Sequence, residues 1–191
     1  MEVSDEQAVA LARGGDQDAF RVLVDRHSRS VYRLAYRMTG NPNDTEDVVQ
    51  ETWLRAWRRL GRFEARAGFG TWLYRIAANC SLDLIRVRER QGRASSFDDG
   101  GVADTVAAGD PGPDRLAISD QVHRKLAEAM AALSPMERAA FVLRHFEGRS
   151  IEEIGEALGR EANATKNCVF RAVAKLRRAL EPVVSGAPCG T

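Results

Sequence analysis

The sequence predicts an all-α protein with two small helical domains joined by a flexible acidic linker, the second domain containing a helix-turn-helix. Apolar residues recur at steps of three and four on both sides of the middle of the chain, which is the period of an amphipathic helix. No stretch of useful length alternates as a strand would. Residues 91–112 are rich in Gly, Ser, Asp and Ala and lack the helical period. We expect domains at 1–93 and 118–184, the linker at 94–117 and a flexible tail at 185–191.

Three helices are expected in the first domain. The first carries apolar positions from Phe20 to Met38 and ends at Gly40, because glycine readily adopts the left-handed conformation of a helix end. After a turn at Asn41-Pro42, a second helix runs to Gly61. Its inward positions are Val48, Val49, Thr52, Trp53, Ala56 and Leu60. The third helix turns inward Leu73, Ile76, Ala77, Cys80, Leu84 and Val87.

Capping signals divide the second domain into helices. Two helices begin with a serine followed three residues later by a glutamate, namely Ser134 with Glu137 and Ser150 with Glu153. These helices are expected to stop at Gly148 and Gly159, and Asn163 to cap the last helix. A short capped helix, a tight turn and a second helix form a helix-turn-helix, a motif whose second helix enters the major groove of DNA.

The last helix has an apolar side and a basic side. Thr165, Val169, Ala172, Leu176 and Leu180 fall on one side at about 100° per residue. The opposite side and its flanks carry the candidate DNA-binding residues Lys166, Asn167, Phe170, Arg171, Lys175 and Arg178. Two amphipathic helices at a turn are common in proteins, so the basic outer face is what favours DNA binding.

Charge is sorted into blocks although the formal net charge is only +1. Ten arginines lie between residues 55 and 93, while residues 41–52 carry only acids. Five aspartates (98, 99, 104, 110 and 114) lie in the linker, and five basic residues lie between 166 and 178. Local blocks, not the total, set the field that a partner meets, and they indicate separate anionic and protein partners.

The composition excludes several classes of protein. With 44% hydrophobic and 29% charged residues in 191, the chain is globular and not disordered. It has no apolar run of the roughly 20 residues that span a bilayer, and no signal peptide, so we expect a cytoplasmic protein without membrane insertion. Cys80, Cys168 and Cys189 are far apart, which argues against a disulfide framework or metal site. The three histidines form no catalytic constellation, so neither an enzyme, a cofactor nor a small-molecule substrate is expected.

Two segments of the chain resemble bacterial sigma factors. The stretch LSPMERAAFVLRHFEGRSIEEIGEALGREANATKNCVFRAVAKLRRAL looks like sigma region 4. DTEDVVQETWLRAWRRL followed by FGTWLYRIAANCSLDLIR resembles sigma region 2. One region 2 and one region 4 with only a linker between them is the arrangement of the extracytoplasmic-function (group IV) class. The resemblance implies an alternative sigma factor that binds RNA polymerase core, recognises −10 and −35 promoter elements and promotes DNA melting.

The resemblance also implies partners for the first domain. The second helix of the family binds the clamp helices of the polymerase β′ subunit, while the β flap is a further contact. The candidate core-polymerase residues, an exposed leucine ringed by acids and an amide, are Asp47, Gln50, Glu51, Leu54 and Arg58. The candidate −10 residues for binding and melting DNA are Arg62, Phe63, Arg66, Phe69, Trp72, Arg75, Asn79 and Arg86. Cations there would follow the backbone and rings would stack on extruded bases, while core packing of Phe63, Phe69 or Trp72 singly is the alternative.

The sequence departs from the family pattern in the last helix and leaves alternatives open. Where relatives commonly read something like GTVKSRLHRAR, this chain has NATKNCVFRAV, so Cys168 and Val173 replace arginines. We therefore expect two DNA contacts to be missing. A probable anti-sigma factor is implied by resemblance only. The alternatives are a helix-turn-helix transcriptional regulator and a polymerase-binding adaptor without initiation activity.

Overall fold

The computed structural model describes residues 3–64, 68–91, 122 and 124–185, with side chains described up to Glu181, and these residues contain helices and no strand. The elements are α1 (Asp5–Arg13), α2 (Gln17–Thr39), α3 (Pro42–Arg59), the 3₁₀ turn η1 (Leu60–Arg62), α4 (Phe69–Arg90), a helical segment at 124–131, α6 (Pro135–His145), α7 (Ile151–Leu158) and α8 (Ala162–Ser185). The all-α prediction is confirmed. The predicted linker and all of the predicted tail except its first residue lie outside the described residues.

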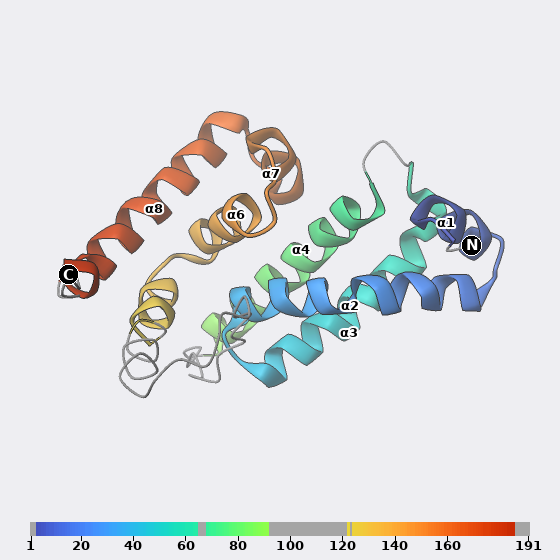
Figure 1. Cartoon of the computed structure of the whole chain (residues 1–191), viewed down its shortest axis with the longest axis horizontal. Coiled ribbons are helices and arrows are strands. Elements are labelled where there is room, and N and C mark those ends of the chain that lie inside the picture. Colours follow the sequence, from blue (N-terminus) through green and yellow to red (C-terminus); the bar gives the residue numbers. More distant parts are fainter. Residues whose placement is uncertain (1–2, 65–67, 92–121, 123, 186–191) are drawn as a thin grey trace, which may run out of the picture.

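The first module is formed by α1 to α4, with α2, α3 and α4 packed lengthwise and α1 at the far end of α2 (Figure 1). Its core contains side chains with no more than 2% exposure, among them Leu23, Leu34, Met38, Val48 and Leu73. The helix ends follow from local sequence. Asn41 caps α3 by accepting from the Asp44 amide, and Gly40 ends α2 in the left-handed conformation at φ 67°.

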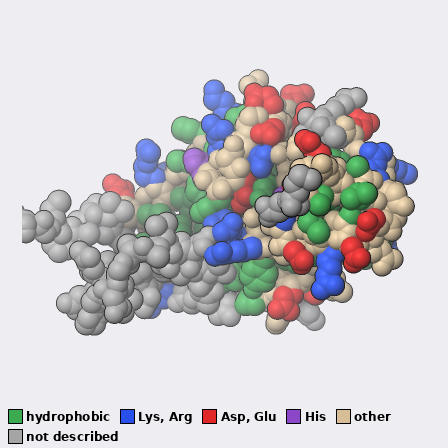
Figure 2. Space-filling view, turned by 45° about the vertical axis from the view of Figure 1, so that its right-hand side comes forward, with side chains coloured by type: hydrophobic (Ala, Val, Ile, Leu, Met, Phe, Trp, Pro, Cys, Tyr) green, Lys and Arg blue, Asp and Glu red, His purple; other side chains and the backbone are tan. Residues whose placement is uncertain are grey.

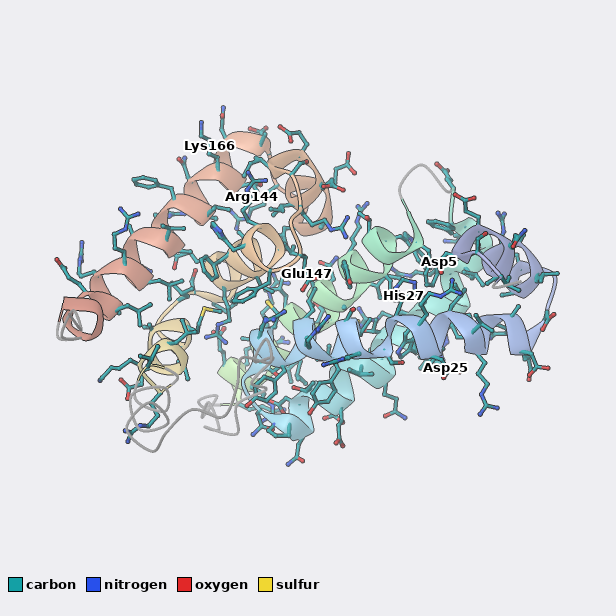
Figure 3. All side chains as sticks on the ribbon, viewed as in Figure 1. Asp5, Asp25, His27, Arg144, Glu147 and Lys166 are labelled. Atoms are coloured by element: carbon teal, nitrogen blue, oxygen red, sulfur yellow. The ribbon has the colours of Figure 1, made fainter. Side chains whose placement is uncertain are left out.

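Polar contacts attach α1 to the rest of the first module. Ser4 and Gln7 form a capping box at the start of α1. Asp5 then pairs with Arg26 and lies 2.8 Å from the His27 imidazole, both on α2 (Figure 3). His27 also contacts the Phe69 ring at 5.4 Å between centroids, so it links α1 to the beginning of α4. Figure 2 shows acidic and basic side chains interspersed with apolar ones at this end of the molecule.

The second module contains the residues from 124 to the end of α8. Both predicted capping boxes are present, Ser134 with Glu137 and Ser150 with Glu153. Gly148 and Gly159 have positive φ angles of 65° and 63°. The prediction for Asn163 is wrong: α8 begins at Ala162, so Asn163 lies inside its first turn. The carbonyl of Glu161 accepts from the Thr165 amide and hydroxyl, which fixes the start of the helix two residues earlier than a cap at Asn163 would.

Helix α4 is buried over a wider arc than its sequence pattern predicts. It packs against α2 and α3, and also against α6 and α7 of the second module. Ile85, which is not among the predicted inward positions, is only 7% exposed, whereas Val87, expected to face inward, is 39% exposed. A helix that contacts two modules needs two apolar sides. A prediction from helical periodicity that assumes a single domain identifies only one buried side of α4.

Candidate nucleic-acid interface

The outer face of α8 is an exposed surface with cationic, amide and aromatic side chains. All six candidate −35 residues are exposed: Lys166, Asn167, Phe170, Arg171, Lys175 and Arg178. Phe170 is 72% exposed, which is unusual for a phenylalanine without a partner. Lys166 lies near the start of α8 and points away from the other helices (Figure 3). The opposite side packs inward through Thr165, Ala172 and Leu176, as the sequence predicts.

The two positions at which this chain lacks the arginines of the family pattern, Cys168 and Val173, do not lie on this outer face. Cys168 is 3% exposed and belongs to the core of the module. Val173 is half-buried and lines an apolar groove with Leu126 and Phe141. The replacements at these two positions therefore affect the packing of α8, and the expected loss of two outward DNA contacts does not fit their placement.

A buried carboxylate of α6 holds two of the candidate DNA-binding cations. Glu137 lies beneath α8, with Lys175 Nζ donating to its Oε2 at 2.7 Å and Arg171 Nε 3.6 Å from its Oε1. Burial by itself would raise the pKa of Glu137, but hydrogen bonds from Lys175 and Ser134 outweigh it and keep the pKa below its usual value. Arg171 stays 60% exposed, so it is oriented by α6 and still open to a ligand. Sequence reasoning assigned Glu137 only to the helix cap and missed this role.

The turn between α7 and α8 needs two glycines for different reasons. Gly159 adopts the left-handed conformation that ends α7. Gly155 is buried, and a Cβ there would come within 2.7 Å of the Arg160 carbonyl oxygen. The close approach of α7 to the start of α8 therefore depends on the absence of a side chain at Gly155.

The candidate −10 residues divide into an exposed basic set and a buried aromatic set. Arg62, Arg75 and Arg86 are exposed. Asn79 is half-buried and its amide donates to the Ala157 carbonyl of α7 at 3.0 Å. Arg66 lies outside the described residues. The sequence therefore predicted the exposed cations correctly. It did not indicate that α7 would bind the Asn79 amide on the same face.

The expected aromatic loop is instead a core cluster. Phe63 and Phe69 are 6% and 4% exposed, and Trp72 is half-buried. The three rings pack on one another with centroids 5.1–6.0 Å apart. Trp72 is the most exposed of the three rings, and the burial of Phe63 and Phe69 in this conformation does not fit the expectation that they present rings for stacking. Their burial follows from the contact of Phe69 with His27 and of α4 with the rest of the module.

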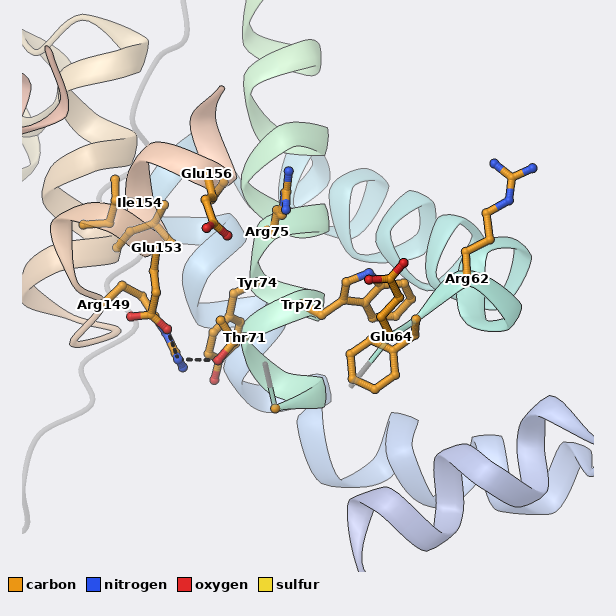
Figure 4. Close-up of a pocket in the computed structure, with 14 residues that line it drawn as sticks. Arg62, Glu64, Thr71, Trp72, Tyr74, Arg75, Arg149, Glu153, Ile154 and Glu156 are labelled. Carbon is orange, nitrogen blue, oxygen red and sulfur yellow. Dashed lines mark hydrogen bonds and ion pairs between the residues drawn. The ribbon is translucent and has the colours of Figure 1, made fainter. Parts of the chain in front are cut away.

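A cleft of about 660 Å³ lies between the start of α4 and α7 (Figure 4). The α4 side contributes Trp72, Tyr74 and Arg75, while Glu64 comes from the segment before α4. The α7 side contributes two acids, Glu153 and Glu156. Both charge types and three aromatic rings therefore meet in one solvent-accessible cleft.

The outer face of α3 is a separate surface. Asp47, Gln50 and Arg58 are exposed and Leu54 is 41% exposed, as predicted. Glu51 is partly engaged, because it accepts from Arg55 at 2.6 Å within an ion-pair chain that continues to Asp83 of α4. Those two hydrogen bonds raise the pKa of Arg55. Trp57, one turn after Leu54, is 39% exposed and was missed, although its i,i+3 spacing from Leu54 was a usable signal.

A further apolar groove of about 490 Å³ lies on the second module. It is lined by Leu126, Phe141, Val173, Leu176, Arg177, Leu180 and Glu181, which come from the segment 124–131, α6 and α8. No single segment carries this pattern, so the sequence could not indicate it. Its apolar floor with a charged rim is typical of a protein contact.

Comparison with known proteins gives these surfaces a family. The Sigma-70 region 2 model matches residues 23–91, and the Sigma-70 region 4 model matches residues 123–176. The ECF RNA polymerase sigma factor SigW of Bacillus subtilis is 31% identical over 188 residues, covering 94% of this chain and 98% of the relative. This chain belongs to the extracytoplasmic-function sigma factors. As an alternative sigma factor it directs RNA polymerase to promoters, with a region 2 built from α2 to α4 and a region 4 that ends in α7 and α8.

Other relatives agree with this family. The ECF sigma factor SigE of Mycolicibacterium smegmatis is 38% identical over 166 residues, which are 85% of this chain, and the alignment spans 63% of that relative's length. The solved structure of CnrH in complex with the cytosolic domain of CnrY matches 93% of this chain and 97% of CnrH, with TM-score 0.66 and 29% identity. RpoE from Bartonella quintana, solved with the anti-sigma factor NepR, matches 85% of this chain and 96% of RpoE, with TM-score 0.62 and 25% identity.

Two further observations concern the described part of this sigma factor. None of its helices there combines the length and apolar character needed to cross a bilayer. Within the same residues, His, Cys, Asp and Glu side chains nowhere gather in a group of three or more that could hold a metal ion.

Proposed function

We propose that this sigma factor divides promoter recognition between two helix faces. The basic face of α4, with Arg75, Asn79 and Arg86, would bind the single-stranded −10 element together with Arg62 of η1, with Trp72 beside it. The outer face of α8 would read the −35 element as duplex. Cations on both faces would hold phosphates, while Arg171 and Asn167 offer the forked hydrogen-bonding groups that pair with base edges.

The polymerase contacts belong to two other surfaces. We propose that the outer face of α3, centred on Leu54 with Trp57 beside it, binds the β′ clamp helices. The apolar groove floored by Leu126 and Phe141 would receive the β flap. Both are apolar centres with charged rims, and neither overlaps the candidate DNA-binding faces. RNA polymerase would supply the catalytic groups, and the sigma factor would act in the cytoplasm with the chromosome.

One observation carries the promoter-reading role. Phe170 is 72% exposed in the middle of a face whose neighbours Lys166, Asn167 and Arg171 are all exposed and polar. An apolar ring among cations on the second helix of a helix-turn-helix matches a major groove, where thymine methyl groups lie beside phosphates. An apolar ring this exposed to water gains nothing in stability, so the arrangement favours a ligand over a purely solvated surface.

Two other functions would use the same faces differently. A free-standing regulator would bind duplex DNA without polymerase and would require dimerisation. An adaptor would bind polymerase without opening DNA. The exposed basic face of α4 beside Trp72 favours the sigma factor over both, since neither alternative needs a surface for single-stranded DNA. The anti-sigma factor NepR, which is bound to RpoE in a related solved structure, supports a further proposal, that this chain too is held by an inhibitor.

Run-off transcription from fragmented genomic DNA with bacterial core polymerase tests the promoter-reading role. Discrete start sites that require this chain are expected, and their upstream sequences give both elements. Arg171→Ala should abolish transcription from a −35-dependent start site, since losing a forked base contact costs about 1–3 kcal/mol, or roughly 5- to 150-fold in affinity.

Arg21→Ala is the matched control, because Arg21 is an exposed arginine of α2 that is not among the residues proposed to bind DNA or polymerase. It should transcribe normally. Normal transcription by Arg171→Ala would contradict the −35 assignment. Polymerase binding without initiation would favour the adaptor, and duplex DNA binding without polymerase binding would favour the regulator.

A further inference from the structure

The two modules of this chain pack directly against each other. In Figure 1, α7 lies beside the first half of α4, and α6 approaches the end of α2. The face of α4 that receives α7 is the face proposed above to bind the −10 element. The second module therefore contacts a surface that the function would need for DNA.

One row of contacts joins α4 to α7 and the residues just before it. The Asn79 amide donates to the Ala157 carbonyl oxygen at 3.0 Å. Arg149 donates to the Thr71 hydroxyl, and its guanidinium lies 5.3 Å from the centre of the Tyr74 ring (Figure 4). These bonds use side chains along about two turns of α4, so they align α7 along the helix.

A second row joins α6 and the turn after it to α2. Arg138 is 5% exposed and its guanidinium donates to three carbonyl oxygens: Met130 at 3.0 Å and Ala131 at 3.2 Å in its own module, and Met38 at 2.7 Å in the first. Burial lowers the pKa of Arg138 to about 10, which leaves the guanidinium charged at neutral pH. One buried cation thus ties helix ends of both modules together.

An ion pair and a stacking contact extend this second row. Arg37 of α2 pairs with Glu147 at 3.5 Å, and its guanidinium lies 4.1 Å from the centre of the Phe146 ring. Figure 3 places Glu147 between the two modules, after α6 and close to α2 and α4. None of these three residues belongs to a proposed DNA-binding or polymerase-binding surface.

The part of α7 that faces the cleft is acidic. Glu153 and Glu156 line it together with Arg75 and Trp72 of α4. Carboxylates therefore lie where phosphates would follow the same cationic face. An acidic helix that also accepts a hydrogen bond from the Asn79 amide competes with a nucleic acid for the α4 face. It competes because it is negatively charged and because it occupies the same space.

We propose that α7 is an internal ligand of the α4 face, so that the free chain rests in a closed form in which α7 covers the −10 surface at Asn79 and faces Trp72 and Arg75 across the cleft. This rests on the proposed function. Elements named −10 and −35 are centred about 25 base pairs apart, or ~85 Å at about 3.4 Å per pair. With α7 seated on α4, the two DNA-binding modules cannot reach both elements, and the contacts of Arg138, Asn79 and Arg149 with the other module must break before both are read.

The experiment weakens the closed form without touching either DNA-binding face. The full chain carries Arg37→Ala with Glu147→Gln, which removes the ion pair and the stacking on Phe146. Solution scattering gives the radius of gyration. Fluorescence anisotropy gives the affinity, without polymerase, for a labelled 12-nucleotide single strand copied from the −10 region of a start site mapped by run-off transcription.

The closed form predicts a larger radius of gyration for the double variant and an affinity for the single strand raised several-fold. Arg37→Lys keeps the charge and should fall between the double variant and the parent, which guards against loss of folding in the double variant. Arg21→Ala should match the parent in both measurements. Unchanged size and unchanged affinity in the double variant would overturn the proposal.

The two readouts separate this proposal from the function on which it rests. A larger radius with unchanged affinity would mean that α7 covers a face that does not bind the single strand, which overturns the occlusion. Tighter binding with an unchanged radius would overturn the closed form while leaving the −10 assignment intact. If run-off transcription fails for the parent chain, the proposed function itself fails, whatever the scattering shows.

Discussion

At the scale of single residues, the placement of Glu137 changes the meaning of the basic face. Its carboxylate accepts from the Ser134 amide at 3.0 Å as part of a helix cap and also holds Lys175 and Arg171 of α8. A long cation on an exposed helix loses rotamer freedom when it binds a ligand, and a cation that is already oriented loses less. Glu137 therefore couples the start of α6 to the residues proposed to read DNA.

Glu137→Gln should lower sequence discrimination at the −35 element. Glutamine keeps the shape and the capping box, but it removes the charge that orients Arg171 and Lys175. Ordering one freed side chain costs about 0.5–1.5 kcal/mol, so the ratio of specific to non-specific affinity should fall about 2- to 10-fold. Duplex binding at fixed salt measures this ratio. Ser134→Ala loses the cap but keeps the carboxylate, and an equal fall in that variant would contradict the orienting role.

At the scale of helices, the exposed side of α3 and the tight turn after α7 are each specified by a few positions. On α3, Leu54 and Trp57 are 41% and 39% exposed, one turn apart. In α7, Gly155 allows the Arg160 carbonyl to approach within 2.7 Å of its would-be Cβ. The exposed side of α3 is proposed to bind a partner, so substitutions there should change binding. Gly155 allows close packing, so a substitution there should change stability.

Leu54→Asn should weaken binding to core polymerase without destabilising the chain. A side chain that is 41% exposed contributes little to folding, and surface changes usually stay within about 0.5 kcal/mol. Truncating an apolar side chain at the centre of an interface lowers the binding free energy by more than about 1 kcal/mol, which weakens Kd at least about fivefold. Titration of labelled protein with core polymerase measures this. Leu11→Asn, 51% exposed on α1, should bind as the parent does, and equal binding by both variants would reject the α3 surface.

Gly155→Ala should destabilise the second module by about 1–3 kcal/mol, because the new methyl group meets backbone that cannot move without shifting α8. Thermal unfolding followed by circular dichroism measures the loss, and −35 duplex binding should weaken with it. Gly61→Ala is the control, since a Cβ there would meet nothing within 4 Å. A Gly155→Ala variant as stable as Gly61→Ala would show that α7 and α8 can separate freely.

At the scale of the whole molecule, the chain has four proposed functional surfaces and cannot use all of them at once in this conformation. The outer faces of α3 and α8 and the apolar groove are open, whereas the α4 face is in contact with α7. The contacts between modules that carry the closed form are hydrogen bonds, an ion pair and cation–ring contacts, and those of them that reach solvent exchange readily for water or for phosphate. A closed resting form that opens on the promoter follows from that chemistry.

The sequence by itself determined the helices from α2 onward, most of their caps and the polarity of their outer faces. Ser150 with Glu153, Gly40 and Gly159 act within one or two turns, and the exposed sides of α3 and α8 depend only on helical period. Local interactions of this kind are readable because neighbours in space are also neighbours in sequence.

Only the tertiary structure decided which of these residues are available. Phe63 and Phe69 became core, Asn79 met the Ala157 carbonyl 78 positions away, and Arg138 met the Met38 carbonyl 100 positions away. The apolar groove also needs side chains from three separate segments. Such contacts depend on how complete helices pack, and no periodicity within one helix records what a second module will cover.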